Sequence, residues 1–161
     1  MKHTISVLVE NRPGVLSKVS GLFSRRGFNI DSLAVGETEK KDISRMTIVV
    51  DGNEYLLEQI EKQLNKLIEV IKVKTLREGA YTNRGLVFFK VSFTERKRAE
   101  IMQIAELFGA VISDVTRSTI TLQFTGGRDR CETLESLLRP YGIKEAVRTG
   151  FIAIEKGAAT I

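Results

Sequence analysis

The chain has few of the side chains from which catalytic and metal sites are usually built. Its 161 residues include one cysteine, Cys131, and one histidine, His3. A single cysteine excludes an internal disulfide framework and a cysteine-based metal cluster within one chain. Cys131 stands at helical spacing from Leu134 and Leu138, so we expect it to pack in the core. Because His3 has no Cys or Asp partner that the sequence reveals, the usual nucleophile, zinc and proton-shuttle arrangements lack their parts.

Long apolar runs are missing as well, and none approaches the length of a membrane span. The first residues enter a strand pattern without the apolar core of a signal peptide. We therefore expect a cytoplasmic protein with no membrane partner. The formal net charge is only +5, and acidic residues stand between the basic ones. This pattern does not indicate a nucleic-acid surface.

Apolar spacing in the first half of the chain predicts the element order βαββαβ. Strands are expected near residues 3–10, 28–36, 43–50 and 67–77, and helices near 13–25 and after the cap at 51–53. The second half repeats this order. There, strands are expected near residues 86–91, 110–116, 119–125 and 143–154, and helices near 95–108 and 128–139.

The repeat predicts two domains in the α+β class. We expect one domain at residues 1–78, a polar, glycine-containing linker at 79–85, and a second domain at 86–161. A βαββαβ unit with right-handed crossovers gives a four-stranded antiparallel sheet with both helices on one face, so each domain should be ferredoxin-like. The other sheet face is then left uncovered, and we expect an oligomer rather than a monomer.

Two short polar runs, at residues 10–16 and 25–30, bracket the first predicted helix. Gly14 leaves the start of this helix bare, so that free backbone N–H groups can face a small anion such as an amino-acid carboxylate. Asn11 leads into the helix, and Asn29 follows it. Each residue also has a structural interpretation: Asn11 and Asn29 suit turns, and Gly14 suits tight packing. Together, at both ends of one helix, they favour a binding site.

Three classes of function compete for this architecture. An RNA-binding domain of the RRM type needs aromatic side chains on its first and third strands, and residues 5–9 and 45–49 contain none. An enzyme needs an acid and base pair, and Asp31 beside Asn29 is no such constellation. A sensor that binds an amino acid and signals to a partner protein fits the bracketed helix.

The runs at residues 5–16 and 21–33 resemble the ACT domain in the family of regulatory small subunits of acetolactate synthase, also called acetohydroxyacid synthase. Further matches at residues 44–48, 57–67 and 114–116 extend the resemblance over essentially the whole chain. The resemblance implies two consecutive ferredoxin-like domains, of which the first is an ACT domain. Many regulators share ACT domains. Among them, the run Arg-Gly-Phe-Asn-Ile-Asp-Ser-Leu indicates the small subunits of acetolactate synthase.

This resemblance implies a regulatory subunit with no catalytic residues, metal or cofactor of its own. Its partner would be the catalytic large subunit, which uses thiamine diphosphate, Mg and FAD. The chain would activate that subunit and confer valine feedback inhibition in branched-chain amino-acid biosynthesis. The alternative is a stand-alone ACT-type sensor that acts on a different partner.

The resemblance also places the effector site between two ACT domains and so implies a homodimer through these domains. The residues that carry over to this site are Asn11, Gly14, Val15 and Asn29, with Ile30 as an apolar neighbour.

Overall fold

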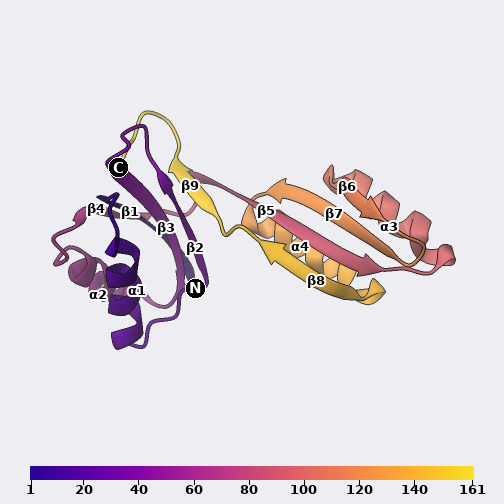
Figure 1. The fold of residues 1–161 in the computed structure, drawn as a ribbon, viewed down its shortest axis with the longest axis horizontal. Helices are drawn as coiled ribbons and strands as arrows, with labels where there is room; N and C mark the ends of the chain where they lie inside the picture. Colours follow the sequence, from indigo (N-terminus) through magenta and orange to yellow (C-terminus); the bar gives the residue numbers. More distant parts are fainter. The chain divides into compact units, whose positions relative to one another are not determined.

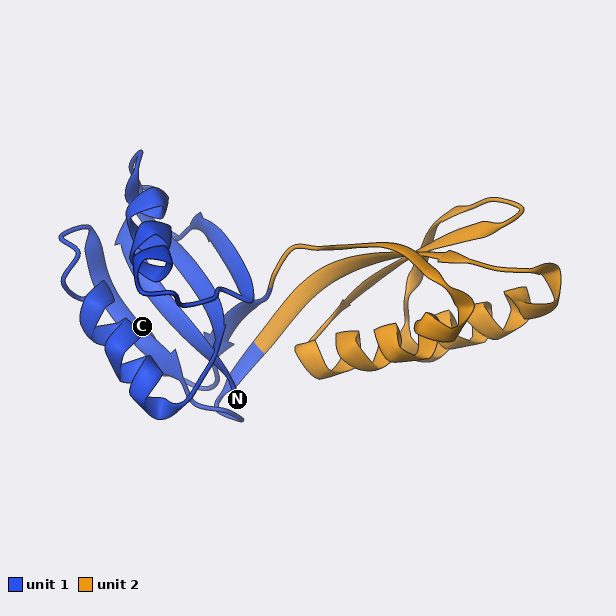
Figure 2. Ribbon diagram, turned by 90° about the horizontal axis from the view of Figure 1, so that it is seen from below, with its two compact units in different colours: residues 1–82, 151–161 blue, residues 83–150 orange.

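The computed structural model describes all residues from 1 to 161 and divides them into two compact units. The first unit contains residues 1–82 and 151–161, and the second contains residues 83–150 (Figure 2). Each unit is a ferredoxin-like α+β fold with one antiparallel sheet, as the sequence predicts (Figure 1). None of the helices could span a membrane.

The first unit follows the predicted βαββαβ order. Its elements are β1 (Lys2–Glu10), α1 (Val15–Arg25), β2 (Ser32–Glu37), β3 (Ile43–Asp51), α2 (Glu54–Leu64) and β4 (Val70–Leu76). The strands lie in the order β2-β3-β1-β4, so β2 and β4 form the edges. The strand expected from residue 28 begins only at Ser32, because the chain first makes a turn after α1 that includes Gly27 at φ 67°.

The core of this unit lies between the sheet and the two helices. Alternate residues of β1, namely Ile5, Val7 and Val9, are buried against this side. On α1 the buried side chains recur at three- and four-residue intervals, which is the pattern of one helix face: Val15, Val19, Leu22 and Phe23. The helix α2 begins at a cap in which Asn53 accepts a hydrogen bond from the Leu56 N–H at 2.9 Å.

Residues 151–161 return across the opposite face of this sheet, which was expected to be open. The Phe151 N–H donates to Ser32 Oγ at 3.0 Å, and Arg45 Nη2 donates to the Ala153 carbonyl at 2.9 Å. The polar side chains of the covered face are accordingly buried; they are Thr4, Ser6 and Thr47. The sequence does not predict this return of the chain, because it requires long-range pairing that local spacing cannot encode.

The second unit repeats the fold with the strand order β6-β7-β5-β8. Its elements are β5 (Tyr81–Ser92), α3 (Glu95–Phe108), β6 (Val111–Val115), β7 (Thr119–Gly126), α4 (Arg128–Leu138), a short 3-10 helix (Arg139–Tyr141) and β8 (Ile143–Arg148). Cys131 is buried here as predicted, and burial raises the pKa of its thiol.

The division into domains and the last strand differ from the predicted ones: the second unit is residues 83–150 rather than 86–161. The expected linker at 79–85 is largely strand, because β5 begins at Tyr81 and pairs with β9 (Ile152–Glu155). Backbone pairing orders this polar segment, as in the hydrogen bond from the Lys156 N–H to the Ala80 carbonyl at 2.9 Å. The single last strand expected at 143–154 is broken into β8 and β9, with Gly150 between them at φ 83°.

Candidate functional site

The start of α1 has the geometry of an anion-binding site. Gly14 is the residue before the helix, and its left-handed backbone (φ 87°, ψ −12°) is one that other residues adopt only with strain. A Cβ built at Gly14 would meet no atom within 4 Å, so the position faces open space. The first helical hydrogen bond runs from the Lys18 N–H to the Gly14 carbonyl at 3.1 Å. The N–H groups of Leu16 and Ser17 precede this bond and lack helical acceptors.

The charges beside this helix start are arranged in pairs. Arg12 lies 2.6 Å from the Glu10 carboxylate and 3.7 Å from the Glu69 carboxylate. Lys18 on α1 also hydrogen-bonds Glu69, whose side chain is 9% exposed. The hydrogen bond from Lys18 is the largest cause that lowers the pKa of Glu69. There is no acidic residue in the first turn of α1, so the helix itself supplies no carboxylate to offset the positive end of its dipole.

The sequence gives no sign of Glu69 as part of this cluster. It lies more than fifty residues beyond Arg12 and outside both polar runs. The antiparallel pairing of β4 with β1 brings it there, and the Glu10 N–H donates to the Glu69 carbonyl at 2.9 Å.

Asn11 ties the end of β1 to the turn between β2 and β3. Its Nδ2 donates to the Lys41 carbonyl at 2.8 Å and lies 3.3 Å from Glu37 Oε1. Its backbone N–H donates to the Asp42 carbonyl at 2.8 Å. These contacts agree with the structural interpretation of Asn11. They use its donors and leave its side-chain carbonyl oxygen, which is the acceptor of the amide, without a partner in the chain.

Val15 differs from the other candidates because its side chain belongs to the core. It is 4% exposed and packs in the cluster between the sheet and the helices. Its backbone N–H lies 3.4 Å from the Arg12 carbonyl. The side chain of Val15 therefore holds the helix start in place and faces away from the open space at Gly14.

Asn29 and Ile30 lie in the turn that leads to β2. Asn29 is exposed, and its Nδ2 donates to Asp31 Oδ1 at 2.6 Å. The Asp31 N–H donates to the Val49 carbonyl at 2.9 Å, which fixes the turn to β3. Ile30 is half-buried and packs against the edge of the core.

The sheet register places the two asparagines at opposite ends of the unit. Glu10 is level with Ile43 on β3, so Asn11 lies at that end. Ser32 pairs with Val49, so Asn29 lies toward the other end. The six residue steps along β3 from Ile43 to Val49 span roughly 20 Å. One chain therefore does not bring Asn11 and Asn29 into one site.

Comparisons with known proteins agree over both units. Residues 5–72 match a family model described as the AHAS small subunit-like ACT domain, and residues 84–157 match the model for the small subunit of acetolactate synthase. The acetolactate synthase small subunit of Mycolicibacterium smegmatis is 50% identical over 155 residues, which cover 96% of this chain and 91% of that one. The chain belongs to the acetolactate synthase small-subunit family.

A solved structure of the same family has the same fold over its whole length. The acetolactate synthase small subunit from Thermotoga maritima superposes with a TM-score of 0.86 and 41% identity, and the match covers 99% of each chain. The regulatory small-subunit family and the N-terminal ACT domain predicted from the sequence are thus confirmed.

Within this small subunit, the second unit does not repeat the bare helix start of the first. The residue before α3 is Thr94, with an extended backbone (φ −99°), and the first turn carries the acidic Glu95. A carboxylate there opposes the binding of a second anion. The geometry at Gly14 therefore belongs to the ACT unit alone.

Proposed function

We propose that this small subunit binds an amino-acid effector at the start of α1 and uses it to regulate the catalytic subunit of acetolactate synthase. It activates that subunit and makes it sensitive to feedback inhibition by valine. The observation that carries the proposal is the helix start at Gly14, with its left-handed backbone, open space and lack of an acidic first turn.

The chemistry of a free amino acid fits the groups around this helix start. Its carboxylate accepts hydrogen bonds from the N–H groups of Leu16 and Ser17, aided by the helix dipole. Its ammonium group donates to the free carbonyl oxygen of Asn11. Arg12 and Lys18 are already paired with carboxylates, so they add little net attraction of their own.

We propose that a second copy of the chain completes the site. The strand β2 is a free sheet edge of six residues, and its Val35 is 46% exposed. Two-fold antiparallel pairing of two β2 edges, centred between Ala34 and Val35, sets Ser32 of one copy opposite Glu37 of the other. The turn that carries Asn29 and Ile30 in one copy then approaches Asn11 and Gly14 in the other copy. Within one chain, the sheet register keeps this turn and the helix start apart.

The acetolactate reaction itself belongs to the catalytic partner, where thiamine diphosphate, Mg and FAD would act. We expect the pure small subunit to form no acetolactate from pyruvate, even with thiamine diphosphate and Mg added. Acetolactate formed under these conditions would overturn this assignment of roles.

Two experiments test the proposed function. Calorimetric titration of the full chain with valine, leucine and isoleucine should give saturable binding of at least valine. Reconstitution with the catalytic subunit should raise acetolactate formation and make it fall as valine is added. A chain that binds none of the three amino acids, or that leaves the catalytic subunit unaffected by valine, contradicts the proposal.

The dimer has its own test. Sedimentation velocity at micromolar protein should give a dimer, whether or not valine is present. A species that remains monomeric under both conditions contradicts a site formed between two copies.

A further inference from the structure

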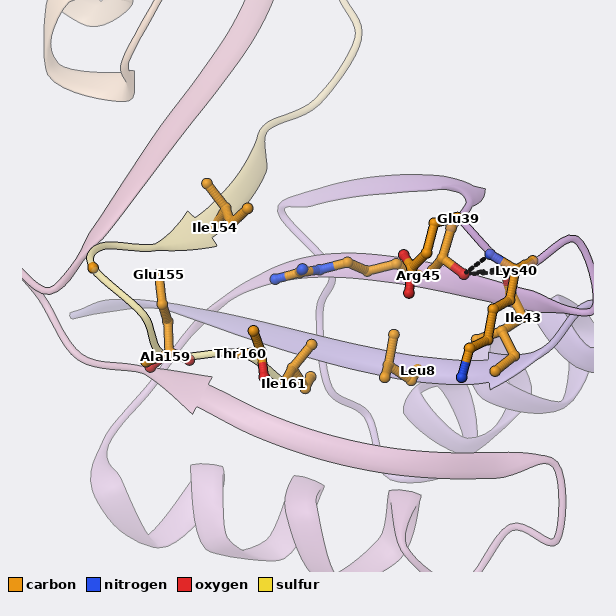
Figure 3. Close-up of a pocket in the computed structure, with 12 residues that line it drawn as sticks. Leu8, Glu39, Lys40, Ile43, Arg45, Ile154, Glu155, Ala159, Thr160 and Ile161 are labelled. Carbon is orange, nitrogen blue, oxygen red and sulfur yellow. Dashed lines mark hydrogen bonds between the residues drawn. The ribbon is translucent and has the colours of Figure 1, made fainter.

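A cavity of about 410 Å³ lies on the face of the ACT sheet that is opposite the helices (Figure 3). One wall is the turn that joins β2 to β3, at residues 38–43, and the other wall is the returning segment at residues 154–161. Leu8 and Arg45 face it from β1 and β3, where they are paired in the sheet. All of these residues belong to the first unit. Because the cavity lies on the face opposite the helices, it is separate from the helix start at Gly14.

The lining combines aliphatic surface with charged groups of both signs. The aliphatic side chains of the lining are Leu8, Ile43, Ile154 and Ile161. The cations are Arg45 on the sheet and Lys40 on the turn, and Figure 3 shows them reaching the cavity from different sides. Of the two carboxylates, Glu155 is bonded to Lys74 at 2.6 Å, and Glu39 lies on the exposed turn. The lining is thus balanced in formal charge, and Glu155, the carboxylate that acts on Arg45, is already bonded to Lys74.

Arg45 has hydrogen-bonding capacity that the chain does not use. A guanidinium carries five N–H donors, and the structure gives Arg45 one hydrogen bond, from Nη2 to the Ala153 carbonyl. Its Nε is buried without a partner, which is uncommon for a charged group. Burial lowers the pKa of the Arg45 guanidinium, and the nearby Glu155 only partly opposes this. An anion beside Arg45 would relieve the cost of this desolvation.

We propose that this cavity is a second ligand site, and that it takes a small carboxylate with a branched aliphatic body. The carboxylate lies near Arg45, and the aliphatic body packs on Leu8, Ile43 and Ile161. The volume is in the range of sites for small molecules, and the mixture of apolar lining with a few polar groups is typical of them. The site is distinct from the proposed valine site because it uses the other face of the sheet, although Asn11 of the valine site holds the turn that forms one wall of the cavity.

The test is a calorimetric titration of the full chain with isovalerate in the presence of saturating valine, which occupies the site at α1. We expect saturable millimolar binding of isovalerate. Isoamylamine, which has the same aliphatic body and a positive charge, should not bind. In methyl NMR spectra, the signals of Leu8, Ile43 and Ile161 should shift with the same dissociation constant.

Two variants locate the binding. Arg45→Gln should weaken isovalerate at least tenfold, as expected when a charge-assisted hydrogen bond is lost. Arg45 also holds the returning segment, so a second variant that keeps Arg45 is needed. Ile161→Asp adds a negative charge at the cavity and should also weaken the binding of isovalerate at least tenfold. The control Lys62→Gln, on the exposed side of α2, should leave the affinity unchanged.

Three results would overturn the inference: no saturable binding of isovalerate, equal binding of isoamylamine, or an affinity unchanged in both Arg45→Gln and Ile161→Asp. Failure of valine to bind would contradict the proposed function only. In that case, isovalerate binding that is lost in these two variants would still support the second site.

Discussion

Replacing Gly14 by aspartate tests the proposed carboxylate position most sharply, and the structure supplies a matched control. The backbone at Gly14 has a φ of 87°, where aspartate and asparagine are the side chains best tolerated after glycine. No atom lies within 4 Å of a Cβ at this position, so either side chain starts into open space. Gly14→Asp and Gly14→Asn should therefore share a cost of about 1 kcal/mol in folding stability.

The two variants differ mainly in charge at the place where the effector carboxylate should lie. Two unit charges about 5 Å apart repel by about 3 kcal/mol at an effective dielectric constant of 20, and by less where water screens them. Gly14→Asp should therefore lose more than about 2 kcal/mol of valine affinity, which is about a thirtyfold rise in the dissociation constant. Gly14→Asn excludes some space but adds no repulsion, so it should lose distinctly less.

The assay is calorimetric titration of each variant with valine, together with urea unfolding to confirm that both variants fold. The reconstituted enzyme with Gly14→Asp should stay active and resist valine. If Gly14→Asp and Gly14→Asn bind valine equally well, there is no carboxylate beside Gly14, and our placement of the site is wrong.

Other consequences of the structure can be measured separately. Asn11→Ala and Asn29→Ala should each weaken valine binding by roughly 1–2 kcal/mol in calorimetry, because each removes one polar partner. Of these two, Asn11→Ala should also lower the urea midpoint, since its amide holds the turn before β3. Glu69→Gln should lower the free energy of unfolding at neutral pH. The contribution of the Glu69 carboxylate to the free energy of unfolding is fully present above the ordinary pKa of a glutamate. It is lost as the pH falls through the lowered pKa of Glu69 in the folded chain. The urea midpoints of the unchanged protein and of Glu69→Gln should therefore converge in acid. A chain that ends at Glu78 should bind the catalytic subunit and lose valine feedback if the second unit couples the two events. This shorter chain also lacks residues 151–161, so it should be less stable than a fusion of residues 1–82 to that segment. If the shorter chain keeps its full sensitivity to valine, the second unit is not needed for signalling.

The sequence predicts the fold well where local patterns carry the information. The spacing of Val15, Val19 and Leu22 marks α1, and the cap at Asn53 marks the start of α2. The helix predicted at 95–108 is found at those residues. In each case the signal is a periodicity or a cap that adjacent residues create, so a single sequence is sufficient to detect it.

The sequence fails where distant segments decide the outcome. Residues 79–85 are polar and read as a linker, yet backbone pairing with β9 makes most of them part of a strand. The return of residues 151–161 buries Thr47 and Ser6, although their polar side chains predict exposure. At the candidate site, spacing identifies Gly14 and its open helix start. It cannot reveal the pairing of Glu69 with this region.

If two copies of the chain build one effector site, mixed dimers of two variants should reveal it. Gly14→Asp changes the helix start, and Asn29→Ala changes the turn that the partner should supply. A mixed dimer of the two variants carries one site with both changes and one site with neither. Each variant is impaired alone. After the two are unfolded, mixed and refolded together, calorimetry should show one valine site per mixed dimer. That site should have the affinity of the unchanged protein. If the mixture binds no better than the separate variants, although mixed dimers have formed, the effector site does not lie between two copies.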